Sequence, residues 1–186
     1  MDQDLILRAQ GGDQRAFDTL ALADYPRLFR VAHGILRNRS HAEDATQTAY
    51  LDIWRNIARL RDPAKFEAWS YRLLVHACYA EAKRTPKWLS DEAMPSSGSP
   101  RAADAYSGVL DRDELEQGFG QISVDHRAVI VLHYLLDMTL PQVAETLGIR
   151  LGTANSRLSR GLDAMRKAMG ADFTSEPDPE PRRRSA

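Results

Sequence analysis

Cysteine is almost absent from this sequence. Cys78 is the one cysteine among 186 residues. A single thiol excludes an intrachain disulfide framework and a cysteine-based zinc site within one chain. Because disulfides belong mainly to oxidising compartments, this cysteine usage favours a reducing, cytoplasmic location.

The sequence also lacks long apolar runs and a strong charge of either sign. No uninterrupted apolar segment approaches the roughly 20 residues that a membrane-spanning helix needs. The start, MDQDLILRAQGGDQ, has no basic region followed by an apolar run, so it does not resemble a secretory signal. We therefore expect no membrane insertion. The formal net charge is −1, so a nucleic-acid surface would require local segregation of charge.

Common catalytic and metal-binding motifs are missing as well. There is no P-loop, dinucleotide fingerprint or nucleophile elbow. The histidines are scattered without metal-ligand spacing: His33, His41, His76, His126 and His133. An enzyme is the alternative from another class, and these absences weigh against it. We expect no catalytic residue, no metal and no cofactor.

The apolar pattern that is present is helical. Hydrophobic residues make up 43% of the chain and charged residues 27%, the balance of a globular protein. Apolar periodicity near 3.6 residues recurs, without the alternation typical of strands. The sequence predicts an all-α fold of two small helical domains, 1–85 and 107–170. Residues 86–106 are rich in Pro, Ser, Gly and Ala, which predicts a flexible linker, and the charged, Pro-rich tail 171–186 is expected to be disordered.

The stretch TLPQVAETLGIRLGTANSRL predicts a helix-turn-helix. Thr139 and Gln142 have the spacing of a capping box, and Gly148 can supply a left-handed turn that ends the first helix. Thr153 is expected to cap the second helix. A packing stripe follows at helical spacing, made of Ala154, Leu158, Gly161, Leu162 and Met165.

The opposite face of that second helix is polar. It carries Asn155, Ser156, Ser159 and Arg160, with Arg157 on the flank. Arginine can pair with guanine and asparagine with adenine, while further cations neutralise phosphates. A solvent-exposed helix in an ordinary bundle is the alternative, but such helices usually pair Glu with Lys. Asp163 is the single acid here, so DNA reading is the better interpretation.

A helix after residue 40 has two distinct faces. Ser40 and Glu43 are expected to form its capping box. Ala45, Ala49, Ile53 and Ile57 share one face, and the other carries Asp44, Gln47, Tyr50, Leu51 and Trp54. Such a helix is either sandwiched in a bundle or binds a partner. Polar groups among aromatics favour a protein interface.

The next helix mixes aromatic and basic residues. Asp62 and Pro63 are expected to start it. Its core side is expected to be Phe66, Trp69, Leu73, Ala77 and Ala80. The residues expected to point away are Tyr71, Arg72, Val75, Cys78, Tyr79, Ala82 and Lys83, with His76 at the margin. Cations and rings suit single-stranded DNA. Equally, the tyrosines could cover the core while the cations are merely solvated.

Three segments together resemble one family. GTANSRLSRGL resembles the GT-x-x-SR-x-x-R signature in region four of bacterial sigma factors of the extracytoplasmic-function group. AEDATQTAYLDIWR is similar to the family's polymerase-binding region, and FEAWSYR to its promoter-melting region. The loop from Arg59 to Lys65 resembles the segment that holds a flipped base. The resemblance runs from about Asp4 to Met169, although His76 and Ala80 replace a common asparagine and aspartate.

This resemblance implies a sigma factor that binds core RNA polymerase and directs initiation at specific promoters. It places polymerase contacts at Asp44, Gln47, Tyr50 and Trp54. Contacts to the minus-ten element fall on Tyr71, Arg72, His76, Tyr79 and Lys83. Contacts to the minus-thirty-five element fall on Thr153, Asn155, Ser156, Arg157, Ser159 and Arg160. The implied partners are core polymerase, promoter DNA and an anti-sigma factor. A repressor with an N-terminal sensing domain would explain only the C-terminal half.

Overall fold

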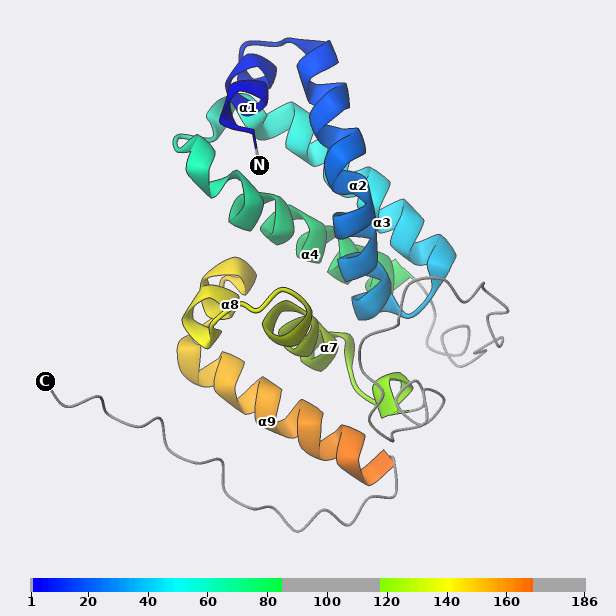
Figure 1. Cartoon of the computed structure of the whole chain (residues 1–186). Coiled ribbons are helices and arrows are strands. Elements are labelled where there is room, and N and C mark those ends of the chain that lie inside the picture. Colours follow the sequence, from blue (N-terminus) through cyan, green and yellow to red (C-terminus); the bar gives the residue numbers. More distant parts are fainter. Residues whose placement is uncertain (1, 85–117, 169–186) are drawn as a thin grey trace, which may run out of the picture.

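The computed structural model describes residues 2–84 and 118–168 (Figure 1). Within these two ranges the secondary structure is helical and contains no strand, which confirms the all-α fold. None of the helices in these ranges is long and apolar enough to cross a membrane. The predicted linker 86–106 and tail 171–186 lie outside the described residues, and the domain boundaries stay predictions.

The N-terminal half is a bundle of four helices. They are α1 (Gln3–Gln10), α2 (Gln14–Leu36), α3 (Arg39–Asn56) and α4 (Phe66–Arg84). Two single turns, η1 (Ile57–Arg59) and η2 (Pro63–Lys65), connect α3 to α4. Helix α3 packs against both α2 and α4. The predicted core face of α3 is confirmed, since Ala45, Ala49, Ile53 and Ile57 are all buried.

Side-chain caps start these helices. Asp62 accepts from the Ala64 amide at 3.0 Å, with Pro63 next, but this predicted cap begins the single turn η2, and α4 itself begins at Phe66. The predicted Ser40 cap is wrong: Asn38 caps α3 and accepts from the His41 amide at 3.0 Å. Arg37 is left-handed, with φ 60°, and ends α2. The turn therefore places Asn38 at the cap position, and Ser40 falls in the first turn.

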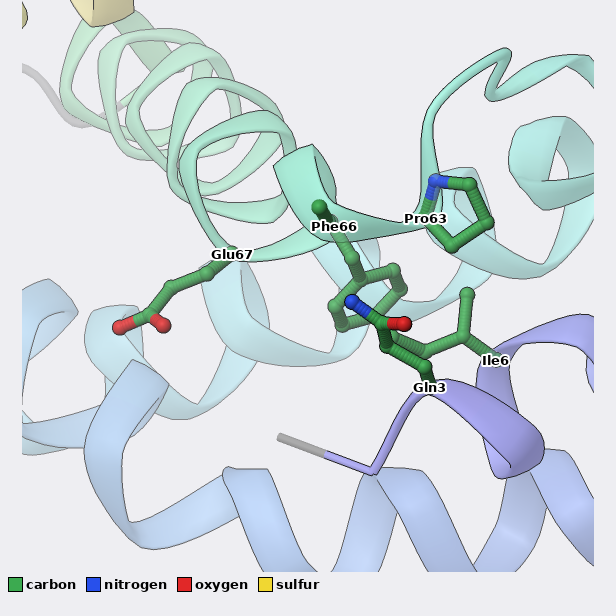
Figure 2. Close-up of a pocket in the computed structure, with 6 residues that line it drawn as sticks. Gln3, Ile6, Pro63, Phe66 and Glu67 are labelled. Carbon is green, nitrogen blue, oxygen red and sulfur yellow. The ribbon is translucent and has the colours of Figure 1, made fainter.

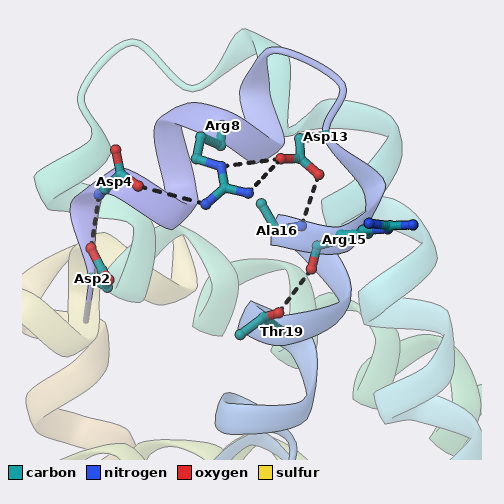
Figure 3. Close-up of polar contacts among 7 residues, drawn as sticks. All are labelled: Asp2, Asp4, Arg8, Asp13, Arg15, Ala16 and Thr19. Carbon is teal, nitrogen blue, oxygen red and sulfur yellow. Dashed lines mark hydrogen bonds and ion pairs between the residues drawn. The ribbon is translucent and has the colours of Figure 1, made fainter.

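A charged cluster holds the junction between α1 and α2 (Figure 3). Arg8 Nη2 donates to Asp13 Oδ2 at 2.7 Å, and Asp4 lies on the other side of the same guanidinium. Asp13 also accepts from the Ala16 amide at 3.1 Å, as the cap of α2. This backbone bond, with Arg8, lowers the pKa of Asp13. These groups are exposed, so the cluster orients the junction rather than stabilising the fold strongly.

Within residues 118–168, the C-terminal half is built mainly on three helices. It comprises α7 (Val124–Ile130), the π-helical segment η3 (Val131–Leu135), α8 (Leu140–Leu147) and α9 (Leu151–Ala168). Helix α9 packs on α7 and α8. A Cβ atom at Gly161 would lie 2.9 Å from Ile130 Cδ1, so glycine permits the close approach of α9 to α7.

The predicted helix-turn-helix is confirmed, apart from one cap. The Thr139 amide donates to Gln142 Oε1 at 2.8 Å in the capping box, and Gly148 is left-handed with φ 65°. The Thr153 cap is wrong, because α9 begins at Leu151. The Arg150 carbonyl accepts from the Thr153 amide at 2.9 Å, so the first helical bond forms one turn earlier than predicted.

The two halves pack against each other. Figure 1 shows α4 between the N-terminal helices and the pair α7 and α8, and α2 also contacts α7 and η3. Buried residues from both halves form one continuous apolar cluster. A Cβ atom at Gly34 of α2 would lie 3.0 Å from Val131 Cγ2, which shows how closely the halves approach. This contact between halves was not predicted from the sequence.

Candidate functional site

Helix α9 presents a polar face to solvent. Asn155, Ser159 and Arg160 are exposed, and we call them the reading face. Ser156 is half-buried, and its hydroxyl donates to the Thr153 carbonyl at 3.0 Å. On the opposite side, the predicted packing stripe is confirmed, with Ala154, Gly161 and Met165 buried and Leu158 and Leu162 half-buried. The three side chains of the reading face are therefore accessible on the side of α9 opposite the packing stripe.

Arg157 is engaged inside the protein. Its Nη2 lies 3.2 Å from Asp125 Oδ2 on α7, and its side chain is half-buried. The Tyr79 hydroxyl of α4 is buried beside the same pair. Burial raises the pKa of Tyr79, and Asp125 raises it further. Two residues predicted to contact different promoter elements thus meet at the junction of the two halves.

The exposed face of α4 is basic. Arg72, His76 and Lys83 are exposed and fall within one stripe at helical spacing, which we call the basic stripe. Lys65, in the turn η2 just before α4, is also exposed and was not among the predicted contacts. Ala80 is also exposed, so the prediction that it faces the core is wrong.

Tyr71 does not belong to the exposed face, and the prediction that it points away from the core is wrong. Its side chain is only 1% exposed, and the Arg27 guanidinium lies 5.0 Å from the ring centroid. Burial raises the pKa of Tyr71 to about 12. Val75 and Cys78 are buried too, contrary to prediction. The reason is that α4 contacts α2 and α3 as well as α7 and α8, so two of its sides are covered.

A further surface spans α2 and α3 on the N-terminal bundle. Trp54 is 39% exposed and packs on Phe17 with ring centroids 4.8 Å apart. Asp44 and Gln47 are exposed, whereas Tyr50 is half-buried and donates its hydroxyl to the Ala21 carbonyl at 3.2 Å. We call this the α2–α3 surface; its exposed members are Leu22, Tyr25, Asp44, Gln47, Leu51 and Trp54.

Leu22 and Tyr25 were missed by sequence reasoning. Leu22 is 78% exposed, and the Tyr25 ring lies 6.3 Å from that of Tyr50. Both project from α2 on a side different from the buried Leu20 and Leu28. A second apolar side on a helix is a recognisable signal for a partner interface, so the spacing of these residues could have found them.

A pocket between α1 and the start of α4 borders the loop from Arg59 to Lys65 (Figure 2). Its lining comprises Gln3, Ile6, Pro63, Ala64, Phe66 and Glu67. Glu67 extends away from Ile6 in Figure 2, and its carboxylate pairs with Arg27. The lining therefore offers no pair of acid and base groups for catalysis.

Comparisons with known proteins identify the family of this chain. Residues 20–86 match the family Sigma-70 region 2, and residues 112–165 match Sigma-70, region 4. The chain is 30% identical over 173 residues to the ECF RNA polymerase sigma factor SigK of Mycolicibacterium vanbaalenii, covering 89% of this chain and 88% of SigK. It is 27% identical over 176 residues to the ECF RNA polymerase sigma factor SigW of Bacillus subtilis, covering 88% of this chain and 94% of SigW.

A solved structure shares the fold. The sigma factor RpoE of Bartonella quintana, in complex with the anti-sigma factor NepR, matches with a TM-score of 0.63 and 22% identity. The match covers 84% of this chain and 98% of that chain. Sigma factors are initiation factors rather than enzymes, which confirms the expectation of a non-enzymatic protein. This chain therefore belongs to the extracytoplasmic-function (ECF) group of RNA polymerase sigma factors, which direct promoter-specific transcription initiation.

Proposed function

We propose that this sigma factor reads the minus-thirty-five element with the reading face of α9. The observation that carries the proposal is the exposure of Asn155, Ser159 and Arg160 opposite the buried stripe of a helix-turn-helix. The first helix, α8, then crosses the DNA backbone while α9 enters the major groove. Run-off transcription on genomic fragments tests this, since core polymerase with the protein should start at sites sharing two promoter elements. Starts identical to those of core enzyme alone would contradict it.

The α2–α3 surface is the proposed contact with core polymerase. Exposed Trp54, Leu51 and Leu22 supply apolar area, and Asp44 and Gln47 supply a polar rim. Interfaces combine an apolar centre with such a rim, and aromatic anchors contribute most of the binding energy. Tyr50 is half-buried beneath these side chains, and its hydroxyl donates to the Ala21 carbonyl of α2, which links α3 to α2. Its proposed role is to position its neighbours rather than to contact polymerase.

The basic stripe of α4 is the proposed contact with the melted minus-ten strand. The stripe carries three side chains that can lie along a phosphate backbone: Arg72, His76 and Lys83. Trp69, on the same helix, is half-buried. The Tyr79 hydroxyl is buried between the halves, so its use in DNA binding requires them to separate. Arg157 pairs with Asp125 within the C-terminal half, so its use in DNA binding requires only that this ion pair opens. We place the protein in the cytoplasm, where core polymerase and promoters are. An anti-sigma factor is a proposed partner, by analogy with the RpoE complex with NepR.

Arg160→Ala is expected to relax specificity at the minus-thirty-five element. Arg160 is exposed on the reading face, and loss of a base contact costs about 1–3 kcal/mol on the preferred sequence. Arg157→Ala should instead weaken all promoters alike and lower the salt slope by about one, as expected for a phosphate contact. Transcription across a library randomised in that element, at two salt concentrations, separates the two outcomes.

Asp125→Asn is the control for Arg157. It removes the charge that pairs with Arg157 at 3.2 Å but keeps the arginine itself. If Asp125→Asn reduces transcription as much as Arg157→Ala, the arginine acts by holding α9 to α7 and not by binding phosphate. If Arg160→Ala lowers every promoter equally and keeps their ranking, its reading role is wrong.

Arg72→Ala is expected to impair strand opening while the fold stays intact. Arg72 is exposed, so its loss opens no cavity, but it removes a cation from the basic stripe. Permanganate reactivity of thymines in the minus-ten element reports opening directly. The matched control is Arg55→Ala, an exposed arginine on α3 outside the stripe. Normal reactivity with Arg72→Ala, or equal loss with both variants, would contradict the assignment.

A further inference from the structure

Three ionisable side chains from two helices meet on the N-terminal bundle. They are His41 and Asp44 of α3 and Glu81 of α4. One nitrogen or carboxylate oxygen from each residue lies within 4.8 Å of the others. His41 Nδ1 is 2.9 Å from Glu81 Oε1. These atoms are of the types that bind metal ions in proteins.

The fold brings the three groups together for identifiable reasons. His41 and Asp44 are three residues apart on α3, so their side chains lie on the same side of the helix. Glu81 comes from the last turns of α4, which packs against α3. Ala42 and Ala45 are fully buried beside the cluster on α3, and such small side chains permit close helix packing.

The hydrogen bond between His41 and Glu81 does not by itself explain why Asp44 lies beside them. Asp44 adds a second carboxylate at the same place, and like charges at close range repel. Arg84 Nη1 is 3.5 Å from Glu81 Oε2, and the arginine side chain is 80% exposed. A divalent cation would balance both carboxylates, while a neutral imidazole nitrogen supplies the third ligand.

We propose that His41, Asp44 and Glu81 bind one divalent first-row transition ion that bridges α3 and α4. Ligands about 2.1 Å from an ion and at right angles lie about 3 Å apart, close to the observed separation of Nδ1 and Oε1. The other ligand atoms lie within 4.8 Å of these two, so binding one ion requires the side chains to draw together. One imidazole and two carboxylates suit zinc, cobalt, nickel or manganese, whereas magnesium and calcium prefer oxygen alone.

The site has a consequence for polymerase binding, and this consequence rests on the proposed function. Asp44 is both a ligand here and an exposed member of the α2–α3 surface. A carboxylate that coordinates an ion is not free to pair with a polymerase side chain. Occupancy by the ion and binding of polymerase therefore oppose each other, by the same factor in each direction.

Cobalt titration of the full chain tests the site. Co²⁺ should bind with one-to-one stoichiometry by calorimetry and produce visible absorption bands. Loss of a residue that only hydrogen-bonds to a ligand usually lowers metal affinity 10–100-fold. His41→Ala and Asp44→Asn each remove a direct ligand, so each should lower the affinity for Co²⁺ at least about 100-fold. Excess Mg²⁺ should not displace Co²⁺. Circular dichroism verifies that each variant is folded, and Asp44 is exposed enough for its variant to fold.

Two variants serve as matched controls. Glu43→Gln removes a neighbouring carboxylate that pairs with Arg39 at 3.0 Å, and His76→Ala removes an exposed histidine elsewhere. Both should bind Co²⁺ like the wild type. The site is wrong if the wild type does not bind Co²⁺, if His41→Ala or Asp44→Asn binds it unchanged, or if the controls lose binding equally.

A second measurement examines the competition. Co²⁺ should weaken core polymerase binding of the wild type but not of His41→Ala, which keeps Asp44. Unchanged wild-type binding at saturating Co²⁺ would overturn the competition and leave the metal site standing. Absence of polymerase binding without any metal would instead contradict the proposed function.

Discussion

Trp54→Ala is expected to weaken binding to core RNA polymerase about 30-fold or more, which corresponds to about 2 kcal/mol for an anchor aromatic. Trp54 is partly exposed and rests on Phe17, so its ring is presented by the fold rather than enclosed by it. The loss should therefore appear in binding more than in thermal stability. Titration of labelled protein with core polymerase, beside thermal unfolding of both proteins, measures the two effects.

Two leucines give a matched comparison for this surface. Leu51 on α3 is 54% exposed, and Leu7 on α1 is 55% exposed but lies outside the α2–α3 surface. Leu51→Ala should weaken polymerase binding, and Leu7→Ala should not. If Trp54→Ala unfolds readily yet binds polymerase normally, the tryptophan serves the internal core and the surface is misassigned.

Tyr71→Ala is expected to destabilise the protein by about 3–5 kcal/mol, the usual cost of deleting a large buried ring. The ring is enclosed, and the alanine variant also loses the contact with the Arg27 guanidinium. Tyr71→Phe is the control. Among the described residues the Tyr71 hydroxyl has no hydrogen-bond partner, so its removal should change stability little. Urea unfolding of the three proteins measures these differences.

Promoter opening separates this structural role from base stacking. Tyr71→Phe keeps a ring that could stack on a base, and it should open promoters like the wild type. Tyr71→Ala, examined at a temperature where it remains folded, should lose much less opening than Arg72→Ala. If Tyr71→Ala is as stable as the wild type but does not open promoters, the buried position of the ring is not maintained in solution.

Local signals were enough to predict the recognition elements. The capping box of Thr139 and Gln142, the left-handed turn at Gly148 and the stripe from Ala154 to Met165 all depend on residues within a few turns of each other. Capping and helical periodicity are short-range effects, so they can be read from sequence. The same holds for the buried face of α3 and for the exposure of Arg160.

Local sequence signals did not predict the structure where two caps, or two sides of a helix, were equally suitable. Ser40 and Asn38 are both competent caps, and the left-handed Arg37 decided between them. Helix α4 is apolar on most sides, with Phe66, Leu73, Val75 and Cys78 around it. Periodicity cannot indicate which side of such a helix faces the core. Contacts with other helices decided it, and they placed Tyr71 inside.

The sequence by itself determined the helical class, the helix-turn-helix and the family of this protein. The tertiary structure alone decided which distant residues meet. Arg157 pairs with Asp125, Gly34 approaches Val131, and Glu81 joins His41 and Asp44 across two helices. The reason is physical: propensity, capping and periodicity act over a few residues, whereas these contacts exist only once whole helices have packed against one another.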